Sequence, residues 1–287
     1  MNTDNNIKNT IPADDVQMGD VLLKQPLPTA TIKHADPFLL LHHVGPLHQE
    51  AGQKSVLDIG GHPHRGFEPV TFIFKGEVHH RDSRGNDSII KSGGVQWMTA
   101  GMGIVHSESA PKSFVEEGGE LELIQLWVNL PSHLKMVQPR YQGHQKEEIS
   151  VIQPKDQSYS LNIIAGNYNG LKGPVESITG IQAYTLDIQA GSSCHLDINP
   201  EHQMLIYQLE GAATINGSES KKHQMTTFNI GAESTVLSSE TFSRFLIISG
   251  RPLEENVTQY GPFVMNTQTE VLEAMRDYQM GKMGILI

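Results

Sequence analysis

Two short dyads of metal-binding side chains constrain this sequence most strongly, namely His62-Pro63-His64 and His106-Ser107-Glu108. In each dyad the two ligand-type residues stand at positions i and i+2. Successive side chains of a β-strand point to opposite faces, so residues two apart project from the same face. Two neighbouring strands of this kind would present three imidazoles and one carboxylate to one point, which suits a mid-to-late first-row metal better than Mg or Ca. The pattern predicts a metalloprotein built on strands.

The segment between the dyads supports this prediction. A single His-x-His is weak evidence, since histidines more often cap loops or pack half-buried. Here, however, the intervening residues alternate between strand and turn patterns, with strands expected at 70–74, 77–81, 88–90 and 95–99 and a break at 100–103. Hairpins of this length predict a small antiparallel barrel, whose closure would bring the two dyads face to face.

This order of motifs resembles the cupin fold and, more specifically, the pirin family. His62, His64, Glu68 and Gly76 match the first cupin motif, and residues 103–106 match the Gly-x-x-His of the second. The resemblance to pirins rests on residues 62–68 and 96–108 and continues through 36–40, 126–131, 139–142 and 261–266. It therefore covers nearly the whole chain and implies an all-β protein of two tandem cupin barrels, of the double-stranded β-helix or jelly-roll type, with a C-terminal helix.

The resemblance also implies a ligand set. One Fe(II) ion per chain would be held by His62, His64, His106 and Glu108, with Mn, Co, Ni, Cu or Zn as substitutes. The glutamate of the first motif, Glu68, is a ligand in many other cupins but not in pirins. Two interpretations of Glu68 stay open. Its side chain could contact and support the metal ligands, or it could lie at the barrel rim and pair with a cation such as Arg65.

The second half of the chain repeats the first in weaker form. Residues 204–211 and 212–216 have the pattern of strand, turn and strand. Upstream, where a His-x-His motif would stand, the sequence has only Glu201-His202, and no His-x-Glu motif follows. We therefore expect a metal-binding domain at 1–138, a linker at 139–155 interrupted by Pro and Gly, and a metal-free cupin domain at 156–287.

A helix is expected near the end of the chain, within the second domain. Residues 267–270 form a capping-box pattern, and Val271, Leu272, Met275 and Tyr278 follow at helical spacing. Gly281 supplies a stop signal. The apolar stripe predicts packing onto a barrel, with a partner-binding helix as the minority alternative.

Composition narrows the choice of partners and compartment. A formal net charge of -11 and the lack of Lys/Arg-rich runs argue against nucleic-acid binding. The polar start of the chain has neither a signal peptide nor a membrane-spanning pattern, so we expect a cytoplasmic protein, or a nuclear one if the source is eukaryotic. The single cysteine, Cys194, excludes an internal disulfide and is interpreted as a small strand or turn residue.

Other histidines and one tryptophan require separate interpretation. His79 and His80 are adjacent, so on a strand only one of them can face the barrel interior, and neither is expected to be a ligand. His42 and His43 are interpreted as structural, although they could approach the cavity. Trp127 is interpreted as a core residue rather than a platform for substrate.

Two classes of function follow from the resemblance. The first is an iron-dependent dioxygenase of the quercetinase type, which opens a small aromatic substrate such as a flavonol with release of carbon monoxide. In that case Glu108 would be both ligand and catalytic base. The second is a regulatory protein whose metal state changes a surface for a protein partner such as a transcription factor. We favour the enzyme because a metal with open positions is chemically competent.

Overall fold

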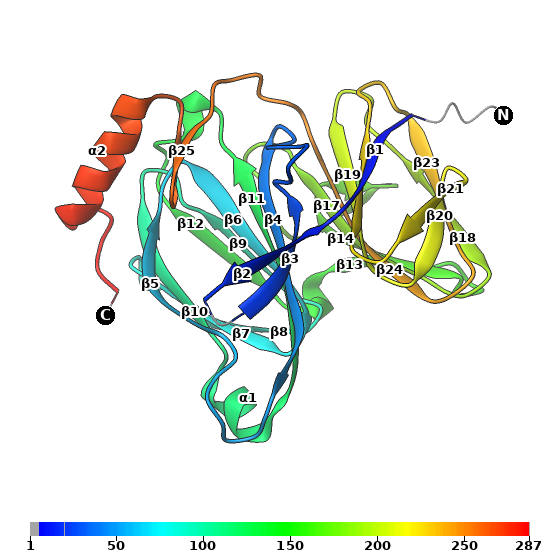
Figure 1. Ribbon diagram of the computed structural model, residues 1–287, viewed down its shortest axis with the longest axis horizontal. Coiled ribbons are helices and arrows are strands. Elements are labelled where there is room, and N and C mark those ends of the chain that lie inside the picture. Colours follow the sequence, from blue (N-terminus) through cyan, green and yellow to red (C-terminus); the bar gives the residue numbers. More distant parts are fainter. Residues whose placement is uncertain (1–5, 20, 287) are drawn as a thin grey trace. The chain divides into compact units, whose positions relative to one another are not determined.

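The computed structural model describes residues 6–19 and 21–286, and it consists mainly of antiparallel strands (Figure 1). Contacts within the chain group it into two units. The first barrel comprises Gln17–Leu23, Phe38–Glu147 and Leu253–Ile287, and it carries both dyads. The second barrel comprises Met1–Val16, Lys24–Pro37 and Glu148–Pro252. Each unit pairs a seven-stranded sheet with a four-stranded sheet, which confirms the all-β, two-barrel fold.

The first barrel places the dyads on its smaller sheet. Its larger sheet has the order β12 (Arg140–His144), β9 (Val95–Thr99), β6 (Phe67–Lys75), β11 (Gly119–Asn129), β4 (Phe38–Gln49), β3 (Val21–Leu27) and β2 (Asp14–Met18). Its smaller sheet has the order β5 (Asp58–His64), β10 (Ile104–Ser109), β7 (Glu77–Asp82) and β8 (Asp87–Lys91). The four strands expected between the dyads are thus confirmed as β6, β7, β8 and β9, with boundaries that differ by at most three residues.

The second barrel has the same two-sheet plan. One sheet has the order β1 (Ile7–Pro12), β22 (Gln224–Phe228), β19 (Gln203–Glu210), β24 (Ser243–Gly250), β17 (Gln182–Ile188), β14 (Tyr159–Ala165) and β13 (Ser150–Ile152). The other has the order β18 (Ser192–Asp197), β23 (Ser234–Ser239), β20 (Ala212–Ile215) and β21 (Ser218–Lys221), and β15 (Asn167–Tyr168) pairs with β16 (Leu171–Lys172). Seventeen buried hydrophobic residues form one core cluster in this unit, Cys194 among them, so its interior is packed with apolar side chains.

We expected continuous domains at 1–138 and 156–287, but each unit consists of three separate segments. The N-terminal segment belongs to the second barrel, and the C-terminal segment belongs to the first. The stretch 139–155, expected to be a linker, contains β12 and β13, and the units meet in sequence between Glu147 and Glu148. Gly143 lies inside β12, which is the edge strand of its sheet, where breaker residues are tolerated. The Pro and Gly residues of this stretch therefore lie within or near short edge strands and not in a linker.

The terminal helix α2 (Gln268–Gln279) begins with the expected capping box of Thr267 and Glu270. It lies in the first barrel with β25 (Thr258–Tyr260) and β26 (Phe263–Met265), not in the second domain as expected. Val271 and Ala274 are its buried residues, whereas Leu272 is 55% exposed, so the apolar stripe is narrower than the sequence suggested. The other α-helix is the short α1 (Lys112–Glu117), and neither described helix is long and apolar enough to cross a membrane.

Candidate metal centre

The two dyads meet through the pairing of β5 with β10. These strands run antiparallel, with His106 opposite His62 and Ile104 opposite His64. Because His62 and His64 are two residues apart on one strand, both imidazoles project from the same face. The pairing shifts register between His106 and Glu108, so Glu108 stands opposite Ile59.

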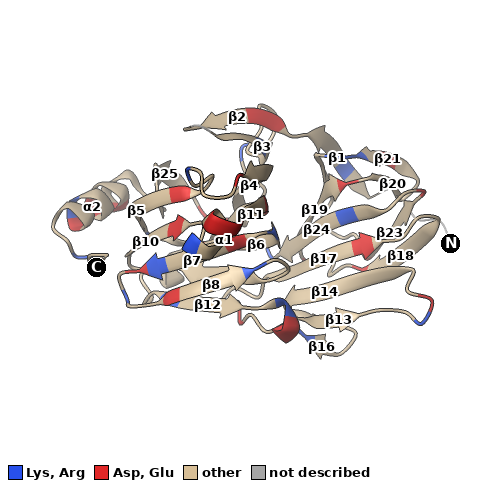
Figure 2. Ribbon diagram, turned by 90° about the horizontal axis from the view of Figure 1, so that it is seen from below, with Lys and Arg blue, Asp and Glu red and all other residues tan. Residues whose placement is uncertain are grey.

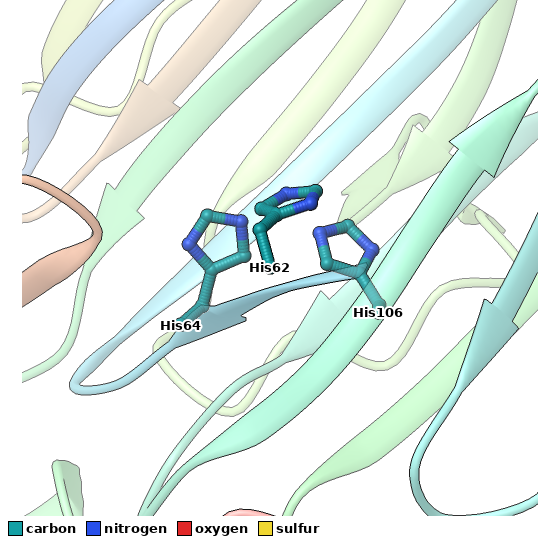
Figure 3. A group of neighbouring side chains, drawn as sticks. All are labelled: His62, His64 and His106. Carbon is teal, nitrogen blue, oxygen red and sulfur yellow. The ribbon is translucent and has the colours of Figure 1, made fainter. Parts of the chain in front are cut away.

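Three imidazoles converge at this point, as Figure 3 shows. The ring centroids of His62 and His106 are 4.3 Å apart, those of His62 and His64 are 4.8 Å apart, and those of His64 and His106 are 4.9 Å apart. One ring nitrogen from each residue can be chosen so that all three lie within 4.8 Å of one another. The spacing is compatible with coordination of a single metal ion.

The hydrogen bonding of these rings leaves nitrogens available for a metal. Both ring nitrogens of His64 and Nε2 of His106 are buried without a hydrogen-bond partner in the described structure. Nδ1 of His62 lies 2.9 Å from the carbonyl oxygen of Gly60, which assigns the proton to Nδ1 and leaves Nε2 as the lone-pair donor. Buried polar atoms normally have partners, so these nitrogens fit a metal site.

The electrostatics of the buried pair also favour coordination. Burial lowers the pKa of His64 and of His106 well below the usual range, and the neighbouring imidazoles lower both further. The nearby carbonyl of Pro262 partly opposes the lowering of the His64 pKa. That carbonyl accepts its hydrogen bond from the backbone N–H of Arg65. Both rings are therefore neutral, which is the form that binds a metal.

Glu108, the fourth expected ligand, is held by two donors. Its Oε1 accepts a hydrogen bond from Thr71 Oγ1 at 3.0 Å, and its Oε2 accepts one from Gln125 Nε2 at 3.1 Å. Trp127 Nε1 in turn donates to Gln125 Oε1 at 3.3 Å. The carboxylate is 5% exposed and lies outside the three-histidine group. The structure thus gathers the three imidazoles and fixes Glu108 two residues beyond His106 through its own hydrogen bonds.

A row of polar side chains crosses four strands of the larger sheet beside Glu108. Gln96 on β9 pairs with Thr71 on β6, Thr71 with Gln125 on β11, and Gln125 with His42 on β4. Paired residues of an antiparallel sheet lie on the same face. All four side chains therefore lie on the face of the larger sheet that points toward Glu108. The amide of Gln96 is buried without a hydrogen-bond partner in the described structure. Burial lowers the pKa of His42 to about 4, so this imidazole is neutral near pH 7.

A cavity of about 490 Å³ opens beside this row. Its lining includes polar Glu108 and Gln125 and apolar Val21, Val44, Leu57 and Leu123. His42 lines it as well. A volume of this size lies within the roughly 300–1,000 Å³ typical of small-molecule sites. Glu108 is therefore shared between the strand of His106 and a mainly apolar cavity.

The remaining candidates are placed as follows. His80 is buried at 1% exposure and His79 is partly exposed, so one of the two faces the interior, as expected. His43 is buried and bonded to Glu122 at 3.1 Å, which makes it structural. Glu68 is fully buried on the face of β6 opposite Thr71, and its hydrogen bond comes from Thr99 at 2.6 Å rather than from Arg65.

Two aromatic rings, those of Phe67 and Trp127, lie beside His64. Trp127 stacks near Phe67 at 4.3 Å between centroids and lies 5.5 Å from His64, so it belongs to the wall of the site as well as to the core. Arg65, next to His64, donates from Nε to the Met102 carbonyl and from Nη1 to Asp277 on α2. The terminal helix therefore supports the strand end that carries the first dyad.

Sequence reasoning missed Thr71, Gln125 and Asp82. The first two come from different strands, and only the register of the sheet places them beside Glu108. The spacing of His80 and Asp82 at i and i+2 was a signal of the same kind as the dyads, since it puts both side chains on one face of β7.

Comparisons with known proteins agree with this architecture. Residues 20–128 match the family described as Pirin, and residues 183–284 match the Pirin C-terminal cupin domain. Pirin-1 of Arabidopsis thaliana is 37% identical over 258 residues, which cover 88% of this chain and 85% of that protein. A pirin-like protein of Solanum lycopersicum is 37% identical over 257 residues, covering 88% and 84%.

A solved structure also agrees with this fold. The crystal structure of a quercetin 2,3-dioxygenase from Acinetobacter baumannii superposes with a TM-score of 0.91 at 34% identity, covering 98% of this chain and 99% of that one. The two family matches, the two-barrel architecture and the histidine cluster agree with one another. The chain belongs to the pirin family.

Proposed function

We propose that the protein is a metal-dependent dioxygenase of the quercetinase type. It would open the central ring of a flavonol with uptake of O₂ and release of carbon monoxide, or cleave the ring of a related enol or catechol with O₂. The observation that carries the proposal is the position of Glu108, which follows His106 on β10 and also lines the cavity. The solved quercetin 2,3-dioxygenase of the same architecture supports it.

We assign His62, His64, His106 and Glu108 as the ligands of one Fe(II) ion. When bound, the metal would supply a Lewis-acidic, redox-active centre for reaction between substrate and O₂. Three imidazoles and a carboxylate suit iron, and Mn, Co, Ni, Cu or Zn are substitutes with overlapping ligand preferences.

Glu108 would act as the base for the substrate. A flavonol must lose the proton of its 3-hydroxyl before ring cleavage, and the Glu108 carboxylate would accept that proton at one of its oxygens. Thr71 and Gln125 donate to the two oxygens and so hold the carboxylate in place. Either donor would have to release its hydrogen bond, or share it, as the carboxylate takes up the proton.

The cavity walls would bind and orient the rings of the substrate. Val44, Leu57 and Leu123 offer apolar surface that excludes water. Neutral His42 would exchange a hydrogen bond with a phenolic hydroxyl or carbonyl at the cavity wall. A planar substrate with oxygens along one edge fits a cavity that is apolar on one side and polar on the other.

The direct test is anaerobic reconstitution with Fe(II), and then with Mn, Co, Ni and Cu. Oxygen uptake is then measured with quercetin and simpler catechols, and carbon monoxide release with quercetin. The Glu108→Gln variant should keep most of its bound metal and lose turnover by about 10²- to 10⁴-fold, as expected on removal of a general base. Glu68→Gln is the matched control, a buried carboxylate of the same barrel outside the site, and should keep turnover.

Inactivity of the fully metal-loaded wild-type protein on the whole panel would overturn the enzyme proposal. In that case a metal-dependent regulatory protein, the second class considered from the sequence, would replace it.

A further inference from the structure

A buried histidine–carboxylate pair lies directly behind the three-histidine cluster. His80 and Asp82 stand on β7, which pairs with β10 so that His106 is opposite Asp82 and Glu108 is opposite His80. Nδ1 of His80 lies 3.4 Å from Nδ1 of His106, and Nε2 of His80 lies 3.1 Å from Oδ2 of Asp82. Both side chains are buried. The contacts form a continuous chain from Asp82 through His80 to His106.

This chain defines where the protons reside. Nε2 of His106 has no hydrogen-bond partner in the described structure and faces the other imidazoles. If that nitrogen binds a metal, the ring proton of His106 must be on Nδ1, which then donates to Nδ1 of His80. His80 must therefore carry its own proton on Nε2 and donate it to Asp82. Each hydrogen bond in the chain has one donor and one acceptor without any change of net charge.

The surroundings prevent both members of the pair from turning. The His80 ring stacks on Tyr141, with centroids 4.2 Å apart and planes inclined by 12°. Oδ1 of Asp82 accepts from the backbone N–H groups of Arg84 and Asn86, and Oδ2 also accepts from Asn86 Nδ2 at 2.8 Å. The carboxylate is therefore fixed by the turn that follows β7, and the imidazole is fixed by the tyrosine.

The same strand offers an internal comparison. His79 projects to the opposite face of β7, where its Nε2 lies 2.7 Å from Oδ1 of Asp87 on β8. Asp87 is exposed, and Arg81 also pairs with it. Both strands carry basic and acidic residues (Figure 2). A second histidine–aspartate contact through Nε2 thus begins one residue away, on the face of β7 that points away from His106.

We propose that His80 and Asp82 are positioning residues for the metal site. They hold His106 in the tautomer and orientation that present Nε2 to the metal, and the carboxylate raises the basicity of that nitrogen through two hydrogen bonds. Groups that bond to the outer nitrogen of a metal-binding histidine contribute in this way in many sites. The proposal rests on the assignment of His106 as a ligand, but it does not depend on the reaction that the metal supports.

The first test measures Co(II) and Zn(II) affinity of the full-length protein by competition with a chelator. His80→Phe keeps the stacking on Tyr141 but removes both hydrogen bonds, and it should weaken binding by about 10- to 100-fold. His79→Phe, the matched control on the other face, should bind as the wild type does. Equal affinity of the two variants, each with wild-type secondary structure by circular dichroism, would overturn the proposal.

A second variant tests the proton assignment itself. In Asp82→Asn the backbone N–H groups of Arg84 and Asn86 still require an oxygen acceptor, so the amide NH₂ points toward Nε2 of His80. Nε2 must then accept, and the His80 proton moves to Nδ1. There it meets the Nδ1–H of His106, and the hydrogen bond between the two rings is lost. We expect a similar loss of affinity and a changed Co(II) absorption spectrum. Asn86→Ala removes a bond to the same carboxylate without changing the tautomer, and its spectrum should match the wild type.

Nitrogen NMR of the Zn(II)-loaded protein reads the tautomer directly. The ¹⁵N shifts of His80 should show protonated Nε2 in the wild type and protonated Nδ1 in Asp82→Asn. Protonated Nδ1 in the wild type would overturn the proposal. Absence of metal binding by the wild type would instead refute the metal centre, so the two failures are distinguishable.

Discussion

Replacing Glu68 by glutamine should remove a pH dependence from the stability of the first barrel. Glu68 is fully buried, with one oxygen bonded to Thr99 and the other without a partner in the described structure. Burial raises the pKa of this carboxyl from 4.5 to about 7. Thr99, the nearby indole of Trp97 and the charge of Arg140 oppose the rise, although the indole makes no hydrogen bond of normal geometry.

The raised pKa means that the folded protein holds the Glu68 proton more tightly than the unfolded chain does. The resulting contribution to the free energy of unfolding is fully present below pH 4.5 and is lost as the pH rises through about 7. The gap between the two pKa values corresponds to roughly 3 kcal/mol. Glutamine is neutral at every pH, so its contribution does not change with pH. The free energy of unfolding of Glu68→Gln relative to that of the wild type should therefore rise by about this amount between pH 4.5 and pH 8.

Urea unfolding at several pH values, followed by tryptophan fluorescence, measures the difference between the two proteins. Trp97 and Trp127 both lie in the first barrel, so the signal reports on the unit that contains Glu68. Glu120→Gln, which removes an exposed carboxylate from β11, serves as the control. Stability curves of wild type and Glu68→Gln that run parallel from pH 4.5 to pH 8 would refute the reasoning.

Three further substitutions test the packing around the site. Lys135→Met should destabilise the protein by about 3 kcal/mol in urea unfolding, because the buried ammonium donates to three oxygens, whereas exposed Lys112→Met should change little. Thr267→Ala should cost about 1 kcal/mol and increase fraying of the terminal helix in hydrogen exchange. Gly66→Ala should lower the yield of folded protein, since its φ is +88° and a Cβ there would overlap the Val264 carbonyl oxygen.

The four strands between the dyads could be predicted because they are separated by strong turn residues. The turn at Gly76 and the turn before β8 appear in the sequence as glycines between β-branched and aromatic runs. Local patterns could not reveal that segments from the two ends of the chain exchange between the units. That exchange depends on contacts between residues far apart in sequence, as does the burial of Ala274 in place of Leu272.

The histidines of the site could be predicted because their spacing is local. His62 and His64 share a strand face by alternation alone, and closure of the barrel then placed His106 opposite His62. The partners of Glu108 have no such signature. Thr71 and Gln125 become neighbours through cross-strand register. A one-residue slip of either strand would separate them, because it turns that strand's side chain to the other face.

The single cysteine makes the second barrel observable without any engineered label. Cys194 is 1% exposed, it lies in the core cluster of that unit, and burial raises the pKa of its thiol to about 12. A thiol reagent therefore reacts with it only when the barrel opens. Because the chain has no second cysteine, the reaction rate under native conditions measures the opening of one identified barrel, with and without added metal.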